Sequence, residues 1–120
     1  MPSTTDNSYS FIVHGKPVPK GRPRMTRGGR VYTPKKTLEW EKLIQDSIDE
    51  DCPRFEGPVE VELTFEAETV MCTVTPMHED AKSKLRGDLD NYIKAFLDGL
   101  QRSNLIEDDK QVLRIDALKA

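Results

Sequence analysis

The chain contains few residues of the kinds that build disulfide frameworks or zinc sites. It has two cysteines and two histidines among 120 residues. Cys52 and Cys72 lie far apart, with no histidine at zinc-finger spacing, so the sequence predicts neither a disulfide framework nor a structural zinc. No apolar run approaches the roughly 18 residues that predict a membrane span. We therefore expect a soluble, cytoplasmic protein without a membrane partner.

Acidic residues are missing from one long stretch of the chain. The formal net charge is −3, yet the segment between Phe11 and Leu38 holds eight lysines and arginines and no aspartate or glutamate. Prolines and glycines interrupt it from Lys16 to Arg30, which predicts an extended basic arm rather than a helix or a central strand. Such an arm attracts the phosphates of DNA, and the alternative is a solvated loop. The expected DNA contacts are Lys16, Lys20, Arg22, Arg24, Arg27 and Arg30.

The length allows one compact domain. Residues 1–8 have the composition of a disordered tail, which leaves residues 9–120 as the folded domain. Hydrophobic alternation and β-branched residues predict strands at residues 9–14, 59–65, 70–74 and 112–118. One helix is expected to start with Thr33 as N-cap and Pro34 in its first turn, and a second to start at Asp88. We expect an α+β fold, in which two main helices pack on a mixed β-sheet.

The second predicted helix carries the residues that suggest a catalytic or metal-binding site. Asp90 and Lys94 are i, i+4 neighbours on the side opposite the apolar arc, and Asp88 stands at the N-cap of the same helix. A helix cap with an ordinary surface ion pair is the simpler interpretation of these three residues. A second acidic step, Asp108-Asp109, follows the helix, and if it folds back, three or four carboxylates converge.

Convergent carboxylates are the ligands that Mg²⁺ or Mn²⁺ requires. A divalent ion can lower the pKa of a bound water and stabilise charge on a scissile phosphate, which suits phosphodiester cleavage. Lys94 would add a fixed positive charge beside the reacting phosphate. Together with the basic arm, this cluster favours a metal-dependent DNA endonuclease.

Two stretches of sequence resemble the RusA-type Holliday junction resolvases. The more specific is GDLDNYIKAFLDGL, followed by EDDKQV, and the looser is FIVHGKPVPKGRPR with the later TPKKTLEWE. The resemblance implies a RusA-like endonuclease domain over residues 9–120, metal ligation by Asp88, Asp90 and Asp109 with Asp108 as a helper, and a catalytic Lys94.

The resemblance also implies a biological role. Members of this family are small α/β homodimers, often encoded by phages or prophages, that nick opposing strands of four-way DNA junctions in recombination and repair. We expect the same of this chain, in a bacterial or phage setting, with Mg²⁺ as the cofactor and Mn²⁺ as a substitute. The alternatives are a DNA-binding module without catalysis and a general metal-dependent nuclease without junction preference.

Overall fold

The computed structural model describes residues 7–20, 24–78 and 83–120. The chain divides into two compact units, Met1–Glu79 and Asp80–Ala120, and each is described by itself. Most of the expected N-terminal tail lies outside the described residues. Across the part that is described, no helix is both long enough and apolar enough to cross a membrane.

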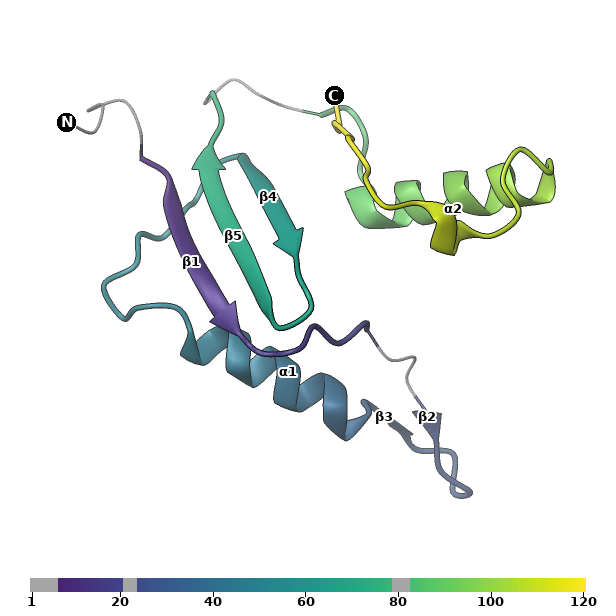
Figure 1. Cartoon of the computed structure of the whole chain (residues 1–120), viewed down its shortest axis with the longest axis horizontal. Helices are drawn as coiled ribbons and strands as arrows, with labels where there is room; N and C mark the ends of the chain where they lie inside the picture. The colour runs from purple at the N-terminus through teal and green to yellow at the C-terminus, as the bar shows by residue number, and fades with distance from the viewer. Residues whose placement is uncertain (1–6, 21–23, 79–82) are drawn as a thin grey trace. The chain divides into compact units, whose positions relative to one another are not determined.

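The first unit is built on a three-stranded antiparallel sheet (Figure 1). Its strands are β1 (Tyr9–His14), β4 (Val59–Phe65) and β5 (Thr69–Pro76), in the order β1-β5-β4. The three strands predicted between residues 9 and 74 are therefore confirmed. The α+β class is also confirmed, although the sheet is antiparallel where a mixed one was expected.

Strand register places the alternating apolar residues on one face of this sheet. Cys72 of β5 pairs with Phe11 of β1 on one side and with Leu63 of β4 on the other. Val13 of β1 pairs with Val70 of β5. Val13 and Val70 form the buried core, with exposed fractions of 2% and 4%. Because side chains alternate between the two faces of a strand, the glutamates of β4 lie on the opposite face.

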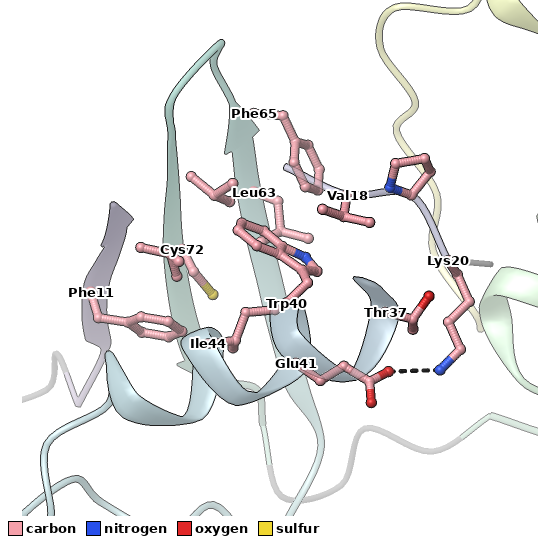
Figure 2. A pocket seen from close by; sticks show the side chains of 13 residues that line it. Phe11, Val18, Lys20, Thr37, Trp40, Glu41, Ile44, Leu63, Phe65 and Cys72 are labelled. Carbon is pink, nitrogen blue, oxygen red and sulfur yellow. Dashed lines mark hydrogen bonds and ion pairs between the residues drawn. The ribbon is translucent and has the colours of Figure 1, made fainter. Parts of the chain in front are cut away.

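Helix α1 (Lys35–Asp46) lies against the apolar face of the sheet. Trp40 and Ile44 point from the helix toward Leu63 and Cys72, around a pocket of about 450 Å³ (Figure 2). The expected N-cap was wrong by one residue. Pro34, rather than Thr33, is the N-cap, because its carbonyl accepts the first helical hydrogen bonds and its extended ψ of 145° lies outside the helix.

The basic arm was expected to be an extended loop throughout, but part of it forms two short strands. Strands β2 (Arg24–Met25) and β3 (Val31–Tyr32) form a two-stranded antiparallel hairpin. The prediction missed it because each strand has two residues, too few to show an alternating pattern. The hairpin leads directly into α1.

The second unit consists of α2 (Leu89–Arg102) and the 3₁₀ turn η1 (Asp109–Gln111), and its other described residues form turns, bends and irregular chain. The start at Asp88 is confirmed, and Asn104 ends the helical segment in a left-handed conformation with φ of 65°. The predicted strand at residues 112–118 is wrong: this segment has no regular structure. A strand needs a partner for its backbone groups, and the segment pairs with none of the described strands. That α2 docks on the sheet stays a prediction.

Candidate active site

Two aspartates stand at the start of α2. Asp88 is the N-cap, with extended backbone angles, and its carbonyl accepts hydrogen bonds from the N–H groups of Asn91 and Tyr92. Its carboxylate makes no capping hydrogen bond. Asp90 follows in the first turn, and both side chains are exposed. The simple interpretation of Asp88 as a capping side chain therefore does not hold, and its carboxylate is available to a ligand.

The backbone that leads into Asp88 is held on both sides. The N–H of Gly87 donates to the hydroxyl of Tyr92 at 3.1 Å, and the ammonium of Lys119 donates to the carbonyl of Gly87, also at 3.1 Å. A Cβ at position 87 would lie 2.9 Å from the Tyr92 ring, so the glycine permits this close approach. Neither of these two contacts was predicted from the sequence.

Lys94 links α2 to η1. Its Nζ lies 3.5 Å from Oδ2 of Asp109 and 3.8 Å from Oδ1 of Asp98. The Asp109 segment thus folds back on α2, and the contact is made at the second turn of the helix, next to Lys94. The Lys94–Asp98 pair has the i, i+4 spacing that the sequence displays, although no role was predicted for Asp98.

Asp108 is engaged with its own turn. Its Oδ1 accepts a hydrogen bond of 2.8 Å from the N–H of Lys110, and Gln111 returns the interaction by accepting from the N–H of Asp108 at 3.0 Å. Two hydrogen bonds lower the pKa of Asp108. The larger effect comes from the backbone N–H of Lys110, and a smaller one from a side-chain hydrogen bond with Asp109. This capping box explains Asp108 without a metal, and its predicted role as a helper ligand has no further support.

The predicted metal ligands fit a divalent ion by their chemistry. Carboxylate oxygens are the donors that Mg²⁺ and Mn²⁺ prefer, and Asp88, Asp90 and Asp109 supply only such donors. In the described part of the chain, however, no three His, Cys, Asp or Glu side chains are grouped closely enough to hold a metal ion. What the structure brings together is Lys94 with Asp109.

The predicted DNA contacts separate into three groups. Lys16, Arg27 and Arg30 have exposed side chains, the last two in the hairpin turn. Lys20 is also exposed but is paired with Glu41 of α1 at 2.6 Å (Figure 2). Arg22 falls outside the described residues, and only the backbone of Arg24 is described. Among the arm cations whose side chains are described, those outside the Lys20–Glu41 pair are Lys16, next to β1, and Arg27 and Arg30 in the hairpin turn.

Comparison with known proteins gives one clear match. Residues 14–120 match the family model described as "Endodeoxyribonuclease RusA", which covers nearly the whole chain, including the arm, α2 and η1. No curated protein and no solved structure matches the sequence.

Proposed function

Because the chain belongs to the RusA family of endodeoxyribonucleases, we propose that it resolves Holliday junctions in DNA recombination and repair by nicking opposing strands in a metal-dependent reaction. The observation that carries this proposal is the ion pair between Lys94 and Asp109. It joins two motifs, 15 positions apart in the sequence, that the cleavage chemistry requires in one place.

In the proposed reaction, Asp88, Asp90 and Asp109 would hold the divalent ion. When bound, Mg²⁺ or Mn²⁺ supplies Lewis-acid activation of water and neutralises charge at the scissile phosphate. The hydrogen bond from the Gly87 N–H to the Tyr92 hydroxyl and the one from the Lys119 ammonium to the Gly87 carbonyl fix the backbone entering Asp88, which orients its carboxylate. Positioning of this kind lowers the entropic cost of reaching the reactive geometry.

Lys94 acts on the phosphate in this proposal. Its side chain is 59% exposed, so a DNA backbone can reach the ammonium while it is paired with Asp109 and Asp98. A fixed cation stabilises the negative charge that develops on the phosphate oxygens in the transition state. Asp109 therefore has two roles: it donates oxygens to the ion and it positions Lys94.

The basic arm supplies affinity for the substrate. Cations of the arm neutralise phosphates, and the release of their counterions gives binding that weakens steeply as salt rises. A homodimer explains paired nicking, because a four-way junction presents two equivalent strands and a two-fold dimer presents two equivalent active sites.

A cleavage assay on a synthetic four-way junction tests the proposal. With Mg²⁺ the protein should give paired nicks, and with EDTA it should bind without cutting. Asp90→Asn should abolish cutting and keep binding, because losing an acidic group does not weaken attraction to phosphates. Binding with no product under any divalent ion would favour a non-catalytic DNA-binding module, and equal cutting of linear duplex would favour a general nuclease. Continued cutting by Asp90→Asn would refute the assigned site.

A further inference from the structure

The β2–β3 hairpin has a defined turn. The N–H of Thr26 donates to the carbonyl of Arg30 at 2.7 Å, and the N–H of Gly29 donates to the carbonyl of Thr26 at 3.0 Å. Gly29 has φ of 83°, a left-handed conformation that glycine adopts without steric cost. A type I turn followed by such a residue is a common three-residue hairpin loop. The tip of the basic arm is thus a hairpin loop with a defined backbone conformation.

This hairpin exposes apolar side chains. Met25 and Val31 face each other across the two strands and are 70% and 66% exposed. Directly paired residues of an antiparallel sheet lie on the same face, so the two form one small apolar surface. Tyr32 follows on the other face and is 47% exposed. Contiguous exposed apolar surface with a polar rim is characteristic of interaction sites.

The charged residues that flank this apolar pair in the sequence, up to the start of α1, are all positive. Arg27 and Arg30 stand in the turn between the strands, and Lys35 and Lys36 follow the hairpin at the start of α1, all exposed. The segment carries no acidic residue. This pattern suits a polyanion that also offers apolar surface, which describes DNA at a position where its bases are accessible.

Both flanks of the hairpin segment attach to α1. Before it, Lys20 pairs with Glu41, and Val18 and Pro19 line the pocket together with Trp40 (Figure 2). After it, the chain enters α1 at Lys35. An exposed ion pair thus joins the chain before the hairpin to α1, the helix that follows the hairpin.

We infer that Met25 and Val31 insert against an unstacked base step at the branch point of the junction, while Arg27 and Arg30 hold the flanking phosphates. The inference rests on the proposed function. Apolar side chains that enter DNA must separate neighbouring bases, which costs a few kcal/mol in continuous duplex. The cost is smallest where stacking is already interrupted, as at a branch point. The hairpin would thus recognise the branched structure rather than a sequence.

Fluorescence of 2-aminopurine at the branch point measures this insertion. Wild-type protein, bound to the labelled junction without divalent metal, should raise the emission, and the same label in linear duplex should stay unchanged. The double variant Met25→Gln/Val31→Thr keeps side-chain size and β-branching while removing the apolar surface. It should lose the rise and bind the junction roughly fivefold or more weakly, as expected for loss of a base contact. Its salt dependence should not change, because no cation is removed.

Two controls keep the experiment decisive. Met71→Gln makes the same chemical change on β5, outside the hairpin, at a side chain that is 45% exposed, and should behave as wild type. Urea unfolding of the double variant, followed by Trp40 fluorescence, tests whether it is folded, and the single variant Met25→Gln provides a milder change at the same surface. A wild type that binds and cuts without a rise, or a folded double variant that keeps it, would overturn the insertion and leave the proposed function intact. A wild type that neither binds nor cuts would overturn both.

Discussion

The ammonium of Lys94 lies 3.5 Å from the Asp109 carboxylate and 3.8 Å from the Asp98 carboxylate, so two acids hold one cation on the exposed side of α2. Only Asp109 belongs to a different element from Lys94. If Asp109 is a metal ligand and Asp98 a simple ion-pair partner, the two should respond differently to the same substitution.

Asp109→Asn is therefore expected to abolish junction cleavage, whereas Asp98→Asn should retain most of it. Losing one transition-state interaction typically lowers kcat by about 10²–10³-fold, and losing a metal ligand also weakens metal binding. Single-turnover cleavage measured across a Mg²⁺ titration checks this. Asp98→Asn is the matched control, since it removes the same charge from the same lysine. Equal loss in both variants would mean that these acids act only through Lys94.

Arg27→Ala and Arg30→Ala should each weaken junction binding and lower the slope of log K against log salt by about 1. Both arginines are exposed in the hairpin turn, where a phosphate can reach them. Lys42→Ala is the control, because Lys42 is equally basic but pairs with Asp46 on α1. Fluorescence anisotropy at several salt concentrations measures the slopes. An unchanged slope for both arginine variants would place the phosphate contacts elsewhere.

Val13→Ala should lower the free energy of unfolding by roughly 2 kcal/mol, because it removes two methyl groups from a fully buried position. Val13 is 2% exposed, whereas its neighbour Ile12, on the opposite face of β1, is 48% exposed. Ile12→Val should therefore cost less than about 0.5 kcal/mol. The single tryptophan, Trp40, lines the pocket between α1 and the sheet and reports urea unfolding. Equal effects of the two substitutions would contradict the assigned register of β1.

Cys72 should react more slowly with a thiol reagent in the folded protein than in urea. Burial raises the pKa of this thiol, because desolvation disfavours the thiolate, and the thiolate is the reactive form. With the raised pKa the folded protein holds less thiolate than the unfolded chain at pH 8, so the difference should shrink as pH rises well above the folded pKa. A Cys52→Ser variant isolates the reaction at Cys72. A folded protein that reacts as fast as the unfolded one would show that the thiol is accessible.

Tyr92→Phe should lower kcat for junction cleavage while leaving junction binding unchanged. The substitution removes the hydroxyl that accepts from Gly87, and loss of one such hydrogen bond is worth about 0.5–1.5 kcal/mol. If that bond positions Asp88, the loss appears in the chemical step, as a reduction of up to about tenfold. Single-turnover rates at saturating Mg²⁺ separate a slower chemical step from weaker metal binding. An unchanged rate would show that Gly87 is held adequately by Lys119.

Local patterns in the sequence determined most elements of this protein. Alternation at Val59–Phe65 and the helical spacing after Asp88 were sufficient, because strand and helix periodicities are properties of consecutive residues. The same holds for the cationic arm and for the family motif around Lys94. The strand predicted at residues 112–118 was wrong, because alternation within a segment does not show whether another strand lies beside it. A strand also needs such a neighbour to pair its backbone groups.

Tertiary structure decided which of the candidate residues meet. Asp108 and Asp109 are adjacent in sequence, yet the first caps its own turn while the second reaches Lys94, and only the path of the chain after α2 distinguishes them. Tertiary contacts also pair Lys20, an expected phosphate contact, with Glu41 of α1. Asp88 is the N-cap of α2, as predicted, yet its carboxylate makes no capping hydrogen bond, while Tyr92 and Lys119 hydrogen-bond with the Gly87 backbone. Sequence fixes which groups a chain carries, whereas distances between groups far apart in sequence depend on how the chain folds back on itself.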